Sequence, residues 1–173
     1  MTAHDPAAVR DVLQGLQDAF AQAKAQRLDA VRRLGRLRPS GGDDTARRVL
    51  AEAVLRREAA DGGDRPLSQR LAVVAAEAGR ARAARRDLSG DAPALALADE
   101  IDATWTDALA TGDRLAAGLQ GRADPPLAAA FGAYVAALRA LHELDPGAGA
   151  ATVGAAVDGY HAALATLERA AGL

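Results

Sequence analysis

A long, uninterrupted helical pattern from Asp5 to Arg38 constrains the fold of this chain more than any other feature. Asp5 is a favourable N-cap, Pro6 suits the first helical turn, and no further proline occurs before Pro39. Residues spaced alternately by four and by three place one stripe along this predicted helix: Val9, Leu13, Leu16, Phe20, Ala23, Arg27, Ala30, Leu34 and Leu37. At 1.5 Å per residue the helix is roughly 50 Å long. A rod of that length needs other helices beside it to bury its stripe.

Breaks that contain proline and glycine divide the rest of the chain into five further predicted helices, at about residues 45–60, 66–88, 93–120, 125–144 and 151–171. The breaks are short, and short connections make consecutive helices antiparallel neighbours. We therefore predict an all-α fold, a six-helix antiparallel bundle with a long N-terminal helix, in a single domain over residues 1–173. Each half has one long helix followed by two shorter ones, which gives two three-helix halves.

The composition favours close-packed helices over a β-sheet. Hydrophobic residues make up 50% of the chain but aromatic residues only 3%, so the core must consist mainly of Ala, Leu and Val. The chain has no cysteine, which excludes disulfides, thiolate metal sites and cysteine nucleophiles. The longest uncharged stretch, residues 125–138, has 14 residues, of which six are alanine. A membrane-spanning helix needs about 20 strongly apolar residues. We therefore predict a cytoplasmic protein with no membrane partner.

Antiparallel folding of the later helices predicts which aromatic residues meet. Folding the fourth and fifth predicted helices about their loop brings Trp105 near Leu141 and His142, and folding the fifth and sixth brings Tyr134 near Tyr160. Glycines within these helices let neighbouring backbones approach closely, at some cost in intrinsic helix stability: Gly112, Gly132 and Gly154.

Charge is unevenly spread, although the net charge is only −2. Residues 1–90 contain 17 Lys and Arg against 12 Asp and Glu, a balance of +5, and residues 91–173 contain 4 against 11, a balance of −7. The chain therefore has a basic half, 1–90, and an acidic half, 91–173. Halves of opposite charge either neutralise each other within one molecule or attract a partner.

The strongest basic cluster lies on the first two predicted helices, where ten Lys and Arg face four Asp and Glu between residues 24 and 57. Part of this charge balances the helix dipole at the end of the first helix. The rest predicts a surface that binds an anion or a partner, made up of Lys24, Arg27, Arg32, Arg33, Arg36, Arg47, Arg48 and Arg57. No aromatic residue occurs between Phe20 and Trp105, which argues against stacking on single-stranded nucleic acid.

The arginines of the third predicted helix have a different interpretation: Arg80, Arg82, Arg85 and Arg86. Folding this helix against the fourth places them beside a group of carboxylates: Asp91, Asp99, Glu100 and Asp102. We predict an intramolecular salt-bridge lattice here rather than a binding site. Each exposed pair is worth well under 1 kcal/mol, so the lattice mainly selects which helices lie side by side.

No catalytic, cofactor-binding or metal-binding motif is complete in this sequence. His142 lacks the second histidine of a zinc-protease motif, and the predicted helix geometry separates it from His161 by about 10 Å or more. Asp158 and His161 share a helix face, and together with Tyr134 and Tyr160 they are the basis for an enzyme with a pocket between helices. We predict no enzyme activity, no cofactor and no metal.

The function predicted from these features is a non-catalytic helical-bundle protein that acts as an interaction, scaffold or regulatory module. We predict self-association as a homodimer, because the first helix is about twice as long as the second and the two halves carry opposite charge. The alternative is a protein that contacts the backbone of duplex DNA through the basic surface of the first two helices, with Arg32, Arg33, Arg36, Arg47, Arg48 and Arg57 as the contacting residues.

Overall fold

The computed structural model describes residues 6–38, 44–120 and 124–172, and within these ranges the only regular secondary structure is helical. The helices are α1 (Pro6–Arg36), α2 (Thr45–Asp61), α3 (Leu67–Asp87), α4 (Ala92–Leu119), α5 (Pro125–His142) and α6 (Ala150–Ala171). The predicted all-α, six-helix fold is confirmed, and each helix begins and ends within two residues of its predicted bounds. Asp5, the predicted N-cap of α1, lies outside the described residues.

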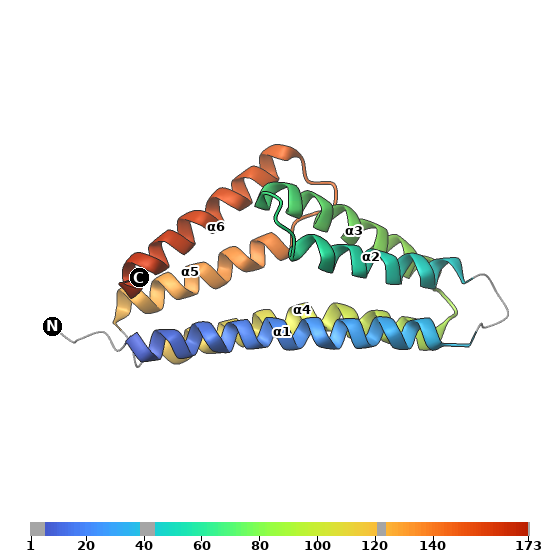
Figure 1. The fold of residues 1–173 in the computed structure, drawn as a ribbon, viewed down its shortest axis with the longest axis horizontal. Coiled ribbons are helices and arrows are strands. Elements are labelled where there is room, and N and C mark those ends of the chain that lie inside the picture. The colour runs from blue at the N-terminus through green and yellow to red at the C-terminus, as the bar shows by residue number, and fades with distance from the viewer. Residues whose placement is uncertain (1–5, 39–43, 121–123, 173) are drawn as a thin grey trace.

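The six helices are arranged as a triangle (Figure 1). α1 and α4 lie side by side along its base and run in opposite directions. The hairpin formed by α2 and α3 leans over the end of the base where α1 ends, and the hairpin of α5 and α6 leans over the opposite end. α3 and α6 meet at the apex, above the middle of the base. Each half of the chain therefore contributes one base helix and one hairpin.

α4 covers the stripe of α1 along most of its length, because the two helices have similar lengths of 31 and 28 residues. Buried residues recur on both helices at helical spacing. In α1 they include Val9, Leu16, Ala23, Ala30 and Leu34, and in α4 they include Ala98, Ile101, Ala108 and Gly112. The part of α1 that extends beyond α2 is therefore covered by α4 within the same chain.

The hydrophobic core is divided among the three corners of the triangle. The first cluster joins the end of α1 to α2, the end of α3 and the start of α4, around Leu34, Leu50 and Ile101. The second joins the start of α1 to the end of α4, α5 and the end of α6, around Leu16 and Phe131. The third, smaller cluster lies at the apex around Leu71, Leu141 and Val153. The middle of the molecule, which no hydrophobic cluster fills, holds polar side chains.

Of the three glycines predicted to permit close helix contact, the structure places one at such a contact. A Cβ added to Gly112 in α4 would lie 3.1 Å from Val135 and 3.2 Å from Leu16. Gly132 and Gly154 have no atom within 4 Å of the corresponding position, so the prediction is wrong for these two residues. Gly112 lies where the base helices and α5 converge on the second cluster.

Folding places the basic end of α1 and the start of α2 beside the acidic start of α4. Arg33 of α1 bonds Glu100, and Arg47 of α2 pairs with Asp91, whose carboxylate also accepts a hydrogen bond from the backbone N–H of Ala94 and so caps α4. Because these contacts join residues of the +5 half to residues of the −7 half, much of the charge asymmetry is neutralised within one molecule.

Candidate functional site

The eight residues predicted to form one basic surface are divided by the fold into an exposed and an internal group. Five are exposed on α1 and α2: Lys24, Arg32, Arg33, Arg36 and Arg48. Arg27 and Arg47 are buried, 2% and 8% exposed, and Arg57 is half-buried and faces the interior. Three of the eight predicted residues therefore point into the molecule, and only the five exposed residues can form the predicted surface.

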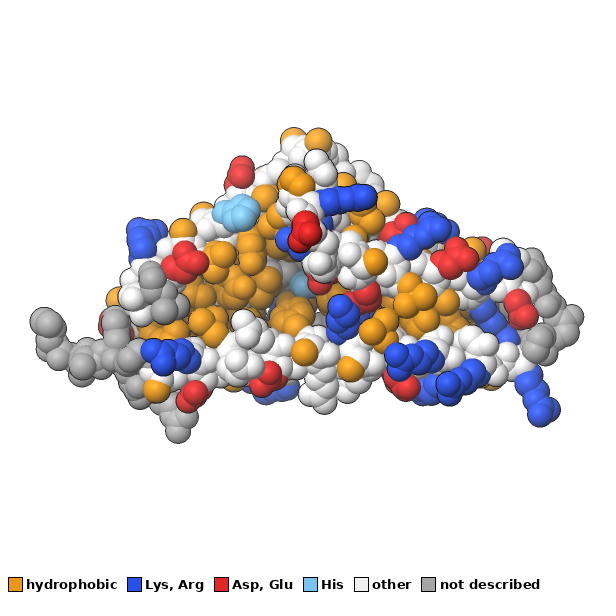
Figure 2. Space-filling model, in the orientation of Figure 1, with side chains coloured by type: hydrophobic (Ala, Val, Ile, Leu, Met, Phe, Trp, Pro, Cys, Tyr) orange, Lys and Arg blue, Asp and Glu red, His pale blue; other side chains and the backbone are white. Residues whose placement is uncertain are grey.

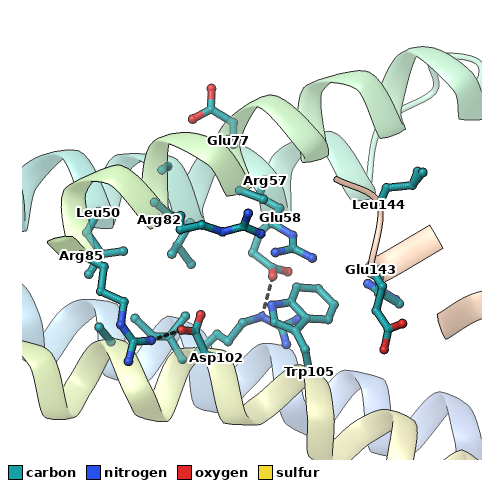
Figure 3. Close-up of a pocket in the computed structure, with 18 residues that line it drawn as sticks. Leu50, Arg57, Glu58, Glu77, Arg82, Arg85, Asp102, Trp105, Glu143 and Leu144 are labelled. Atoms are coloured by element: carbon teal, nitrogen blue, oxygen red, sulfur yellow. Dashed lines mark hydrogen bonds and ion pairs between the residues drawn. The ribbon is translucent and has the colours of Figure 1, made fainter. Parts of the chain in front are cut away.

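The salt-bridge lattice predicted for α3 forms mainly through Arg85. Its guanidinium pairs with Asp99 and Asp102 of α4 (Figure 3 shows the Asp102 bond). Arg80 pairs instead with Glu77 in its own helix, at 2.9 Å, and with Glu52 of α2, at 3.9 Å. The predicted link between α3 and α4 is thus present.

A buried polar cluster occupies the middle of the triangle, and Arg27 of α1 is its centre. The Arg27 Nε donates to Glu58 Oε1 of α2 at 2.7 Å, and its Nη1 donates to the hydroxyl of Thr104 in α4 at 2.9 Å. Its guanidinium carbon lies 3.3 Å from the centre of the Trp105 ring. Glu58 and Thr104 are also buried, 5% and 3% exposed. Arg27 therefore ties α1 to α2 and α4 where there is no hydrophobic cluster.

Trp105 and His142 form the wall beside this cluster. The centre of the His142 ring lies 4.7 Å from that of the Trp105 ring and 5.5 Å from that of the Phe20 ring, on which it stacks. The predicted meeting of Trp105 with His142 is therefore correct, whereas the part played by Phe20 was not predicted. Burial lowers the pKa of His142 to about 4, and the positive charges of Arg57 and Arg27 act in the same direction.

Arg57 of α2 is the unusual member of this wall. Its guanidinium carbon lies 4.3 Å from the centre of the Trp105 ring, yet Arg57 has no ion pair or hydrogen bond with any residue that the structure describes. Its Nε is buried without a partner. Burial, together with the neighbouring charge of Arg27, lowers the pKa of Arg57. Arg57 is thus a cation without a counter-charge in contact.

Arg57 faces a cavity of about 420 Å³ between the base and the two hairpins. Figure 2 shows this face of the molecule hollowed between the base and the hairpins, with hydrophobic and charged side chains and a histidine in the hollow. Residues from α1, α2, α3 and α4 line the cavity, together with His142 at the end of α5. In the close-up view, Arg82 extends from α3 toward Arg57 and Glu58 (Figure 3).

Four arginines and four carboxylates line this cavity, so its wall is neutral overall, but the charges are paired unevenly. Each carboxylate in its wall has a basic partner: Glu58 pairs with Arg27, Asp102 with Arg85, Glu77 with Arg80 and Glu143 with Arg139. Two arginines of the wall, Arg57 and Arg82, have no ion pair with the described part of the chain. The positive charge of the wall that has no ion-pair partner is therefore located at Arg57 and Arg82.

A second, smaller chamber of about 180 Å³ lies on the other side of the wall formed by Arg57, Trp105 and His142. Most of its remaining lining is apolar: Leu67, Leu71, Val74, Leu138 and Leu141. Arg70 also lines it, and its Nε, like that of Arg57, is buried without a hydrogen-bond partner. The two partnerless buried side-chain nitrogens found in the described residues thus belong to arginines of this one chamber.

The residues proposed for an interhelical enzyme pocket do not come together around a cavity. Tyr134 and Tyr160 meet as predicted, with ring centres 5.8 Å apart, but Asp158 and His161 are exposed. Of these four, Tyr160 alone lines one of the two interior cavities. In residues 6–38, 44–120 and 124–172, no three His, Asp or Glu side chains are grouped so that they could hold a metal.

The central site could have been recognised from helix periodicity. Arg27 occupies a stripe position of α1, four residues after Ala23 and three before Ala30. Arg57 and Glu58 continue the buried positions of α2 that include Leu50 and Val54. A charged residue at a stripe position indicates either a buried ion pair or a site. Arg27 was predicted both on the stripe of the first helix and in the basic surface, and the structure shows it buried on the stripe.

Protein-family models, curated proteins and solved structures were compared with the chain, and none matches it. No described helix combines the length and the apolar character needed to cross a bilayer.

Proposed function

We propose that this protein is a non-catalytic regulatory module that binds a small anion at Arg57. The observation that carries the proposal is a half-buried guanidinium that faces a cavity, lacks a counter-charge and has Arg82 beside it. A buried donor without a partner destabilises the folded state by about 1–3 kcal/mol, and more when it is charged. An anion bound at this point would recover that free energy.

The position of the site supports a regulatory role. Arg57 belongs to α2, Arg82 to α3, Trp105 to α4 and His142 to the end of α5, so an anion among them contacts both hairpins and the base. A ligand shifts a conformational equilibrium when it binds one arrangement better than another. An anion that holds the two hairpins against the base would favour one arrangement of the six helices. A partner protein that binds this arrangement better than the others would then respond to the anion.

The experiment is a titration with inorganic phosphate and with acetate at constant ionic strength, measured by calorimetry and by thermal unfolding. We expect binding with one anion per chain and a rise in Tm of about 5–10 °C at a hundredfold excess over Kd. Arg57→Gln should reduce anion affinity at least tenfold without lowering the stability of the unliganded protein, because it removes an unpaired charge.

Arg48→Gln is the matched control, because Arg48 is an exposed arginine of the same helix. It should bind both anions as the wild type does. Equal losses in the two variants would assign the effect to general surface charge, and a wild type that binds neither anion would refute the proposal.

Self-association and binding to duplex DNA are further proposals, and fewer observations support them than support the anion site. Two features suggested a dimer: the part of α1 that extends beyond α2, and the opposite charges of the two halves. Within the chain, α4 covers that part of α1, and ion pairs between the halves neutralise much of the charge. In the described ranges, Leu55 is the single large hydrophobic side chain that is exposed, at 47%, so an interface would have to be polar. Exposed arginines remain at one end of the base: Arg32, Arg33, Arg36, Arg38 and Arg48.

A further inference from the structure

We infer that the anion bound by this protein carries an apolar tail of about six carbons, which occupies the second chamber. This inference rests on the proposed function, because it places the charged head of the ligand at Arg57. The side chain of Arg57 lines both cavities, so one guanidinium can hold a head group whose tail points into the chamber.

The chamber has the two kinds of surface that an amphipathic anion requires. Its apolar wall comes from the start of α3 and the end of α5, through Leu67, Leu71, Val74, Leu138 and Leu141. Its polar side carries Arg57 and Arg70, each with a buried Nε that lacks a partner. A carboxylate at the boundary between the two cavities would be attracted to the guanidinium of Arg57, and Arg70 adds a second positive charge to the chamber.

The other polar groups around the chamber are compatible with a carboxylate. Asp61 is the one acidic residue among the described residues that line the chamber; it is exposed, and its backbone oxygen already accepts a hydrogen bond from Arg70 Nη1 at 2.6 Å. His142 and Tyr160 complete the lining. The lining thus carries two arginines against one carboxylate, which favours an anionic head over a cationic one.

The volume of the chamber limits the length of the tail. At about 30 Å³ for each water-sized group, 180 Å³ holds roughly six heavy atoms. A tail longer than this would have to displace side chains from a packed core, which opposes binding. The ligand class is therefore a short- to medium-chain carboxylate rather than a long-chain lipid or a fully polar phosphate ester.

The test measures how affinity depends on chain length, with Trp105 as the reporter. Trp105 is the single tryptophan of the chain and lines both cavities, so its fluorescence reports occupancy of either one. Titrating acetate, butanoate, hexanoate and decanoate should show affinity rising about three- to fourfold with each methylene up to about six carbons, and no further rise at ten. Hexylammonium, with the same tail and the opposite charge, should not bind.

Variants that fill the chamber separate the contribution of the tail to affinity from that of the charged head. Val74→Phe should abolish the advantage of hexanoate over acetate while the affinity for acetate stays unchanged, and Leu138→Phe serves the same purpose if the first variant fails to fold. Leu55→Phe, on the exposed face of α2, is the control and should retain the wild-type dependence on chain length.

The two proposals fail in different ways. If acetate binds but affinity does not depend on chain length, or if Val74→Phe retains the advantage of hexanoate, the inference of a tail is overturned and the anion site at Arg57 stands. If none of the carboxylates binds but phosphate does, the inference of a tail is overturned and the anion site stands; if phosphate does not bind either, both proposals are overturned.

Discussion

At the scale of the residue, whether a basic side chain is buried depends more on its position along the helix than on its residue type. Arg27 and Lys24 lie three residues apart in one basic run, yet Arg27 is buried against Glu58 and Trp105 whereas Lys24 is exposed. The difference follows from the 3.6-residue helical period, which turns Arg27 toward α2 and α4. Breaking its pair by truncating one partner would leave the other charge buried, which destabilises strongly.

His142 gives a prediction about pH at this scale. Because burial lowers its folded-state pKa to about 4, the unfolded chain, with a pKa near 6.5, binds more protons between these values. Stability therefore falls as pH falls from 6.5 toward 4. We expect the free energy of unfolding to be about 2 kcal/mol lower at pH 5 than at pH 7.5, as measured by urea denaturation.

Two variants check the assignment to His142. His142→Gln should lose most of this pH dependence, while His161→Gln, on an exposed face of α6, should retain it. A wild type with equal stability at pH 5 and pH 7.5 would contradict the assigned role of His142. Anion binding at Arg57 should also raise the pKa of His142, because it offsets the nearby positive charge.

At the scale of the element, the contact between the two base helices and α5 depends on one glycine. Gly112 lies in the interior of α4, where glycine is unfavourable by roughly 1 kcal/mol relative to alanine, and it is retained where Val135 and Leu16 approach closely. The close approach explains why a residue with poor helix propensity is found in a helix as long as α4.

Gly112→Ala should therefore destabilise the protein by about 1 kcal/mol, because crowding against Val135 and Leu16 exceeds the gain in helix propensity. Gly159→Ala is the matched control, since Gly159 lies within α6 and has no atom within 4 Å of the added Cβ. It should stabilise by about 0.5–1 kcal/mol. Thermal or urea unfolding measures both, and an equal gain in the two variants would show that the contact at Gly112 is loose.

At the scale of the whole molecule, three corner cores surround a polar centre, and Leu55 is the one large hydrophobic side chain exposed among the described residues. A partner bound to the surface, whether a second copy or duplex DNA, would be held by charge and would be sensitive to salt. The five exposed arginines at the end of the base are the surface available for such a contact.

We expect sedimentation velocity, with and without duplex DNA, to detect a complex at 50 mM salt that dissociates at 500 mM salt. Two charge reversals, Arg36→Glu and Arg48→Glu, should weaken the complex. The reversal Arg65→Glu, beyond the end of α2 and away from that end of the base, should not. If the protein sediments as a monomer at 50 mM salt and its sedimentation does not change when duplex DNA is added, both self-association through charge and DNA binding are rejected.

Sequence alone determined the helices, because proline, glycine and the spacing of apolar residues act locally. It also determined the neighbours joined by short loops, and hence the contacts of Trp105 with His142 and of Tyr134 with Tyr160. Tertiary structure alone decided that α4 rather than a partner covers α1, and that Arg57 lacks a counter-charge while Arg27 has one. The cover of α1 and the pairing of the two arginines depend on contacts between residues far apart in the chain, and local periodicity does not encode such contacts.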